Sequence, residues 1–183
     1  MRALILLALW LFSCLAQAAD RPQNLTPLTR FYDKKRNVHA YAYSDEELAA
    51  WRAADGIKEH IFVGDITTME LPGTVRLWRA IREKDKKHFY YITAPRAASG
   101  VNVDNENFRV FVWKSPGDGR IPIYGSTWTD GTDVFFDPDP NNVKKFAADT
   151  KKALGIERKE LGPRAVFYVY PHPKEEESQS KAK

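Results

Sequence analysis

The sequence repeats one aromatic-rich pattern three times, and this repetition limits the folds that the chain can adopt. Each copy consists of three short runs of apolar, β-branched and aromatic residues. The runs are LTRFYD (28–33), HAYAYS (39–44) and HIFVGDI (60–66); VRLWRA (75–80), HFYYIT (88–93) and FRVFVW (108–113); and IPIYGS (121–126), DVFFDP (133–138) and AVFYVY (165–170). A period of this length is typical of repeated units that bury their apolar faces only against one another.

The runs and the segments between them predict the elements of each copy. The first two runs, separated by a polar turn, predict a hairpin, and the third run predicts a further strand. In the first copy, Ser44 and Glu47 form a capping box that predicts a short helix between the second and third runs. In the third copy, a longer helix is predicted to begin after Asp139 and to stop at Gly155. The equivalent segment of the second copy, 94–107, predicts a loop or a single helical turn.

These elements indicate a β-rich α+β fold. Three ββ(α)β repeats predict a closed pseudo-threefold arrangement, which is either β-trefoil-like or small and propeller-like. The spacing does not distinguish the two. The predicted boundaries are a signal peptide over 1–18, an N-terminal linker over 19–27, a three-repeat domain over 28–171 and a disordered tail over 172–183. The repeats within the domain are predicted at 28–66, 73–115 and 121–171.

The first eighteen residues are typical of a secretory signal. They contain Arg2, an apolar run too short to span a bilayer, and an A-x-A cleavage pattern that ends at Ala18. A rival interpretation is a bacterial lipobox ending at Cys14, in which that cysteine would carry a lipid anchor. We favour simple cleavage, which predicts a secreted, periplasmic or extracellular protein without cysteine, because Cys14 is the only cysteine.

The charge and hydropathy of the remaining chain exclude two partner classes. The formal net charge of the full sequence, +4, is modest, only Arg2 of it lies in the predicted signal, and basic residues are interspersed with acidic ones. This distribution does not predict a nucleic-acid partner. No later segment is apolar enough to predict a membrane span.

The recurring phrase also resembles a known domain family. RFYD at 30–33 followed by His39, and RLW at 76–78 followed by HFY at 88–90, resemble the R-F-Y-N…G-x-H-F-Y-T repeats of a secreted three-repeat family of unknown function. Members are often appended to extracellular lipases or peptidases. In many members of that family a Thr-Gly pair stands between R-F-Y-N and H-F-Y-T. The first two copies here lack this pair, and the third copy has Asp133 in place of the histidine. The resemblance implies a three-repeat fold and secretion, and it implies no reaction.

Three residues at matching strand starts form a candidate metal site. His39 and His88 lie 49 residues apart, and Asp133 follows His88 by 45. If the strand starts converge, two imidazoles and a carboxylate would provide a facial metal triad. The interpretation we favour is structural, with each imidazole bonded to the backbone of its own hairpin. The acidic run 130–139 fits no EF-hand loop, and we expect no cofactor.

Four residues are candidates for ligand binding. Trp128 lies in a polar turn and Tyr91 faces away from Tyr90, so both rings are predicted to be exposed and available to stack on sugar rings. Arg30 and Arg76, predicted to occupy equivalent positions 46 residues apart, could clamp an acidic ligand. Stacking or ion pairing between adjacent repeats is the interpretation we favour for these arginines.

Taken with the missing catalytic motifs, these features predict a non-catalytic module. The sequence contains no G-x-S-x-G elbow, no H-E-x-x-H and no phosphate-binding glycine loop. We expect a secreted repeat module that binds an extracellular glycan or cell-surface polymer. The alternatives are a secreted hydrolase or metal-dependent enzyme that uses His and Asp from different repeats, and a protein-interaction or inhibitor module.

Overall fold

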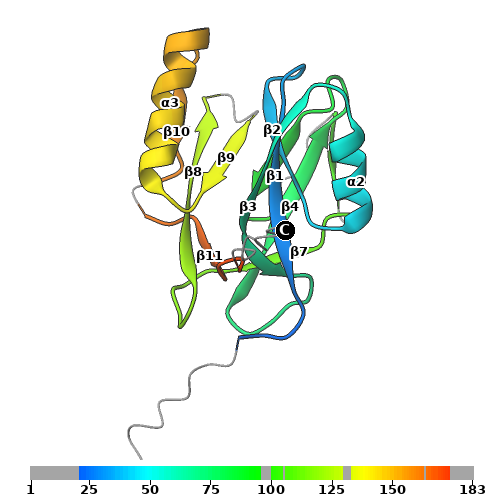
Figure 1. Cartoon of the computed structure of the whole chain (residues 1–183), viewed down its shortest axis with the longest axis vertical. Helices are drawn as coiled ribbons and strands as arrows, with labels where there is room; N and C mark the ends of the chain where they lie inside the picture. The colour runs from blue at the N-terminus through cyan, green and yellow to red at the C-terminus, as the bar shows by residue number, and fades with distance from the viewer. Residues whose placement is uncertain (1–20, 96–99, 105, 130–132, 163, 174–183) are drawn as a thin grey trace, which may run out of the picture.

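The predicted β-rich α+β composition is confirmed. The computed structural model describes residues 21–95, 100–104, 106–129, 133–162 and 164–173, without the side chains of residues 59 and 60. This part of the chain forms eleven strands and two helices, with the strands joined in one sheet (Figure 1).

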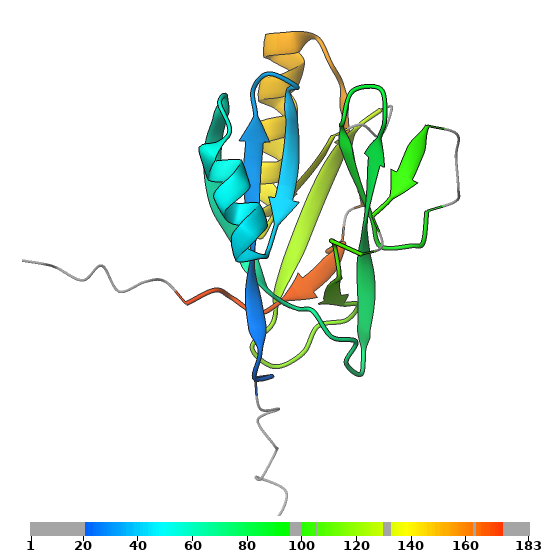
Figure 2. The same cartoon turned by 90° about the vertical axis from the view of Figure 1, so that its right-hand side faces the viewer.

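The first unit is a hairpin followed by a helix and a returning strand. Its elements are β1 (Leu25–Asp33), β2 (Val38–Ala42), α2 (Asp45–Ala53) and β3 (Ile57–Thr67). β1 is central and pairs antiparallel with β2 and with β3. The Ser44 side chain caps α2 by accepting a hydrogen bond from the Glu47 N–H, as predicted. Leu48 of α2 packs with Phe31 and Ala42, and Figure 2 shows α2 lying against the β1–β2 hairpin.

The second unit repeats this strand order without a helix in its described residues. Its elements are β4 (Thr74–Arg82), β5 (His88–Tyr91), β6 (Val101–Val103) and β7 (Val110–Trp113). β4 is central: it pairs with β5, and successive stretches of it pair with β7 and β6. The short strand β6 lies where the sequence predicts a loop or a single helical turn.

The third unit has the same central opening strand and carries the longer helix. Its elements are β8 (Ile121–Trp128), β9 (Val134–Asp137), α3 (Pro140–Leu154), β10 (Arg158–Glu160) and β11 (Phe167–Val169). β8 pairs with β9, β10 and β11. Asp139 caps α3 by accepting from the Asn141 N–H, and Gly155 ends the helix at φ 68°, as predicted.

The closing strands of the three units meet one another. Thr67 of β3 lies opposite Phe111 of β7, and Tyr168 of β11 lies opposite Trp113 of β7. An isolated bridge joins Asp65 of β3 to Tyr170, directly after β11. The sheet as a whole is an open path from β10 to β2, so the closed trefoil-like or propeller-like ring stays a prediction.

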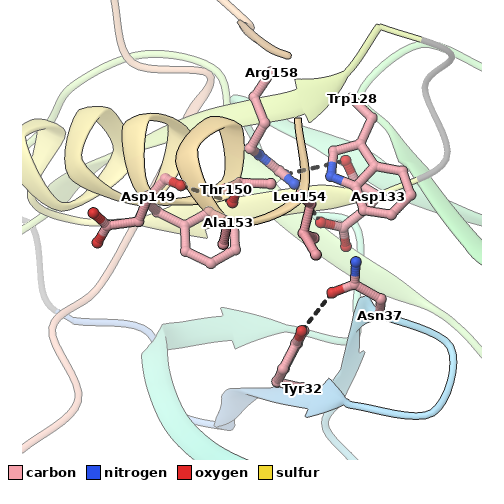
Figure 3. A pocket seen from close by; sticks show the side chains of 10 residues that line it. Tyr32, Asn37, Trp128, Asp133, Asp149, Thr150, Ala153, Leu154 and Arg158 are labelled. Carbon is pink, nitrogen blue, oxygen red and sulfur yellow. Dashed lines mark hydrogen bonds and ion pairs between the residues drawn. The ribbon is translucent and has the colours of Figure 1, made fainter. Parts of the chain in front are cut away.

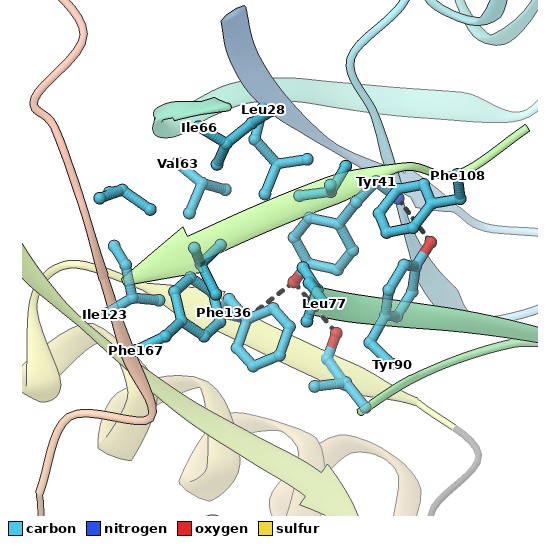
Figure 4. Close-up of a cluster of buried hydrophobic side chains, with 14 residues drawn as sticks. Leu28, Tyr41, Val63, Ile66, Leu77, Tyr90, Phe108, Ile123, Phe136 and Phe167 are labelled. Atoms are coloured by element: carbon cyan, nitrogen blue, oxygen red, sulfur yellow. Dashed lines mark hydrogen bonds between the residues drawn. The ribbon is translucent and has the colours of Figure 1, made fainter. Parts of the chain in front are cut away.

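One hydrophobic core contains side chains from all three units (Figure 4). Tyr41 lies at its centre. The Tyr41 hydroxyl donates to the Val134 carbonyl and accepts from the Phe136 N–H, while the Tyr41 N–H donates to the Tyr90 hydroxyl. Burial raises the pKa of both Tyr41 and Tyr90, so their hydroxyls stay protonated donors. Each fully buried large side chain stabilises such a core by about 1.5–3 kcal/mol.

Two predicted boundaries need correction. The linker was predicted to run to residue 27, but β1 begins at Leu25, which lies opposite Thr67 of β3. The tail was predicted from residue 172, but the His172 ring contacts Asp65 at 2.6 Å and packs against the Phe62 ring at a centroid distance of 4.3 Å. At the two ends of the described chain, Arg21 donates to the carbonyl of Pro171 at 3.3 Å. The predicted signal peptide, Cys14 and residues 174–183 lie outside the described residues.

Candidate functional site

Two of the three predicted metal ligands meet in a buried polar network. His39 at the start of β2 and Asp133 just before β9 come from different units, and His39 Nδ1 lies 3.0 Å from Asp133 Oδ1. The His39 backbone N–H donates to the same oxygen at 2.5 Å. Arg158 of β10 completes the network by donating to Asp133 Oδ2 at 2.6 Å and to Ser126 Oγ at 3.1 Å.

The surroundings of this network make it a junction between units. Burial would raise the pKa of Asp133, but His39 and Arg158 outweigh that effect and lower it, so the carboxylate stays charged. The His39 ring lies among aromatic rings, with centroid distances of 5.1 Å to Tyr32, Phe135 and Phe146. A charged carboxylate held by the His39 ring and the Arg158 guanidinium links the first unit to the third.

His88, the third predicted ligand, does not join this network. Its ring packs against Trp51 of α2, and its Nδ1 lies 3.3 Å from the Tyr90 hydroxyl. Burial and the nearby Arg79 lower the pKa of His88 to about 4. Among the described residues, no group of three His, Cys, Asp or Glu side chains could hold a metal ion. The predicted triad of His39, His88 and Asp133 is therefore not assembled.

Arg30 makes the contact between repeats that we favoured. Its guanidinium donates to the Phe136 carbonyl at 2.6 Å, pairs with Asp137 at 3.2 Å and lies 4.1 Å from the Phe135 ring centroid. Arg30 belongs to β1 and its partners to β9. A buried arginine so engaged supports the packing of the first unit on the third.

Arg76 is not the counterpart of Arg30. Arg30 lies opposite Tyr41 in its hairpin, and the residue opposite Tyr90 in the second hairpin is Arg79. Arg76 instead stacks on Trp78 of its own strand and donates to the Phe108 carbonyl. The predicted equivalence of Arg30 and Arg76 is therefore wrong by three residues.

Arg79, which the sequence analysis did not select, is the buried cation between the first and second units. It donates to Asp104 at 2.6 Å, forms an ion pair with Glu47 of α2 and contacts the Tyr41 carbonyl. Burial raises the pKa of Glu47 despite this arginine. Arg30 and Arg79 thus perform the same task at successive unit boundaries.

Trp128 lines a cleft between α3 and the first unit. This hollow of about 260 Å³, which we call the Trp128 cleft, is bordered by Tyr32, Asn37, Trp128, Phe146, Asp149 and Leu154, among others. Figure 3 shows α3 along one side and the hairpin residues Tyr32 and Asn37 along the other. The walls are mainly apolar, with a few polar groups at fixed positions, as is typical of small-ligand sites.

The indole of Trp128 is more buried than predicted. Only 8% of the residue is exposed, and Lys87 lies 4.9 Å from the ring centroid. The prediction of an exposed ring is therefore wrong, since Trp128 ends β8 beneath neighbouring side chains. Its indole Nε1 is buried and has no hydrogen-bond partner in the part of the chain that the structure describes. Figure 3 shows this nitrogen turned toward Arg158 and Leu154 on the cleft wall.

Tyr91 lines a separate apolar groove and is exposed as predicted. The groove, of about 220 Å³, is bordered by Tyr90, Tyr91, Ile92, Phe136, Leu161 and Val166. Tyr91 is 38% exposed, and its ring is parallel to that of Phe89 at a centroid distance of 6.4 Å. The groove brings the second unit next to the third.

Comparisons with known proteins do not assign the chain to a family. No protein-family model matches the chain, and no curated protein or solved structure matches it either. The resemblance to the three-repeat family therefore stays a prediction. In the part of the chain that the structure describes, neither helix has the length and apolar character needed to cross a membrane.

Proposed function

We propose that the chain is a secreted, non-catalytic repeat module that binds an extracellular glycan or surface polymer in the Trp128 cleft. The observation that carries this proposal is the buried indole N–H of Trp128, which has no acceptor among the described residues. An unsatisfied buried donor costs about 1–3 kcal/mol. A ligand oxygen could accept this hydrogen bond once the side chains that bury the nitrogen move aside, and it would then remove that cost.

The other groups of the cleft suit a sugar ring. A sugar presents C–H groups on its faces and hydroxyls, which both donate and accept, around its edge. Tyr32, Phe146 and Leu154 offer apolar surface to the faces. Asp149 forms no hydrogen bond or ion pair with any described residue, so its carboxylate is available to accept from a hydroxyl.

Tyr91 supports the same class of ligand at a second place. Its exposed ring and the exposed Ile92 and Leu161 line one groove. Exposed aromatic rings on a rigid scaffold are suited to stacking on the apolar faces of sugars. We assign this groove a secondary role because the groove, unlike the cleft, has no unsatisfied buried donor on its wall among the described residues.

We further propose that the three units stand about a pseudo-threefold axis. The proposal is supported by the common order of the units, each with its opening strand at the centre, and by the mutual contacts of β3, β7 and β11. Arg30 and Arg79 at equivalent hairpin positions support it too.

A hydrolase is less well supported. Among the described residues, two His–Asp pairs join different units. His172 contacts Asp65, which Arg21 also binds. His39 pairs with Asp133, and both of those side chains are 2% exposed. Asp133 is also held by Arg158. A general base needs reach to the proton that it removes, and aromatic rings surround the His39 imidazole.

Glycan binding tests the proposal directly. The purified chain without its signal segment would be screened on an array of extracellular glycans, and a responding oligosaccharide would be titrated while tryptophan fluorescence is followed. Trp128→Phe keeps a ring but removes the N–H, and we expect a loss of affinity of at least about tenfold, equal to about 1.4 kcal/mol.

Trp78→Phe is the matched control, because Trp78 is partly buried and lies outside the cleft. It should bind like the wild type. A silent array, or equal affinities for Trp128→Phe and wild type, would contradict the proposal. A peptide or protein ligand recovered by the same cleft would favour the interaction-module alternative.

A further inference from the structure

A second hollow adjoins the Trp128 cleft along α3. It has a volume of about 270 Å³ and is lined by Arg30, Ile61, Asn142, Lys145, Phe146 and Asp149, among others. Phe146 and Asp149 also border the Trp128 cleft. The two hollows therefore lie on either side of the same two side chains. We call the second one the Ile61 hollow.

The spacing of residues on α3 gives the direction of the combined groove. Lys145, Asp149 and Ala153 are four residues apart, so they follow one another along a single face of the helix. Lys145 lines the Ile61 hollow, Ala153 lines the Trp128 cleft, and Asp149 lines both. Eight residues of helix rise about 12 Å. The groove thus follows the helix axis over more than two turns.

The opposite wall comes from the first unit at both ends. Tyr32 and Asn37 border the Trp128 cleft, while Arg30 and the 40% exposed Ile61 border the Ile61 hollow. The groove therefore runs along the boundary between the first and third units, which the pairs His39–Asp133 and Arg30–Asp137 hold together. Those buried pairs give a rigid floor and preserve the spacing of the hollows.

We infer that the ligand is a linear oligosaccharide that occupies both hollows and places hydroxyls against Asp149 between them. This inference rests on the proposed function and specifies its ligand as a chain, in contrast to a single sugar. The Trp128 N–H marks one end and the Asp149 carboxylate lies in the middle, and neither has a partner among the described residues. Lys145 and the apolar Ile61 side chain provide the contacts at the other end.

A length series separates a chain ligand from a single-sugar ligand. The glycan class that responds on the array would be prepared as oligomers of one to six units, and each would be titrated by calorimetry. We expect affinity to rise by about tenfold or more, equal to about 1.4 kcal/mol, when the oligomer becomes long enough to enter the Ile61 hollow. Longer oligomers should gain little more.

Variants of the Ile61 hollow locate the added units. Ile61→Ala and Lys145→Ala change exposed side chains, so both should fold normally. They should weaken binding of the long oligomers about five- to tenfold and leave the shortest binding oligomer unchanged. Lys144→Ala is the control, since Lys144 is the neighbouring residue on α3 but lines a different hollow.

The outcomes distinguish this inference from the proposed function. If affinity does not depend on length, or if the two variants bind long oligomers like the wild type, the chain ligand is wrong while the Trp128 cleft still binds sugar. If Trp128→Phe leaves the affinity for every length unchanged, the proposed function itself fails. The inference would also be overturned by an extended peptide that binds along α3 without displacing a bound saccharide, because the saccharide would then not occupy this groove.

Discussion

His39 Nδ1 lies 3.0 Å from Asp133 Oδ1, and this contact joins the first hairpin to the third. The residues are 94 positions apart in the sequence. Because Arg158 donates to the same carboxylate, loss of Asp133 would leave one cation fully buried and unpaired. Asp133 should therefore contribute more to the free energy of unfolding than an exposed acidic residue does.

Asp133→Ala should lower the free energy of unfolding by about 3–5 kcal/mol, the typical cost of removing one member of a buried ion pair. Urea unfolding followed by circular dichroism measures the change. The control is Glu157→Gln, which removes an exposed partner of Lys151 on the same part of the chain. That variant should unfold at the wild-type urea concentration. Equal losses in both variants would contradict the importance assigned to the junction.

Arg79→Met should destabilise the boundary between the first and second units. The substitution leaves the partly buried Glu47 and Asp104 without their common cation, and we expect a loss of about 3 kcal/mol. Arg52→Met on α2 is the control, because Arg52 is exposed. A wild-type melting temperature for Arg79→Met would show that the two carboxylates do not need this arginine.

Gly64→Ala should be costly because β3 and β11 approach closely there. A Cβ at Gly64 would lie 2.3 Å from Val169 Cγ2 and 2.8 Å from the Tyr170 carbonyl oxygen. Such overpacking typically costs about 1–3 kcal/mol. Gly73→Ala is the matched control: Gly73 also has a positive φ, 77°, but a Cβ there would have no neighbour within 4 Å. The cost of Gly73→Ala should be confined to backbone strain, about 1 kcal/mol. Urea unfolding midpoints measure both variants, and a lower midpoint for Gly73→Ala than for Gly64→Ala would contradict the importance of the close approach at Gly64.

The buried His88 should make the stability of the protein fall as the pH drops below about 6.5. Its pKa in the folded protein, about 4, lies below the value of 6.5 for an exposed histidine. The unfolded chain therefore binds a proton between these values that the folded chain does not, so the free energy of unfolding falls as the pH drops from about 6.5 toward 4.

His88→Gln tests this effect because glutamine does not titrate. As the pH drops from about 6.5 toward 4, the free energy of unfolding of the wild type should fall relative to that of the variant. The slope of this difference should be at most about 1.4 kcal/mol per pH unit. Urea titrations at half-unit steps of pH measure the slope. Parallel profiles for the two proteins would show that His88 is not responsible for any acid sensitivity.

The strands and helices were largely predictable because local signals specify them. All nine predicted strands correspond to observed ones, and the caps at Ser44 and Asp139 form as expected. The three-residue strands β6 and β10 were missed because VNV and RKE are too short to show alternation. Their pairing depends on the neighbouring strands β4 and β8.

The candidate site was less predictable because it depends on register and on contacts between units. The similar phrases around the two arginines pointed to Arg76 as the counterpart of Arg30. The spacing of 49 residues between His39 and His88, applied to Arg30, gives Arg79 instead, as the register shows. Trp128 was selected for an exposed ring, and the structure assigns importance to its buried nitrogen instead. No local pattern marks Arg158, which reaches Asp133 only after α3 and β10 have folded back.

The contact of Arg21 with the Pro171 carbonyl has a consequence for the order of the units along the chain. The first and last described segments lie side by side, so a short peptide could connect them. The segment 114–119 between the second and third units is exposed and could hold the new termini. A circularly permuted chain, with units in the order three, one, two, would keep His39 beside Asp133 and Arg79 beside Glu47. In such a chain the first and third units, which border the groove, would become consecutive in the sequence.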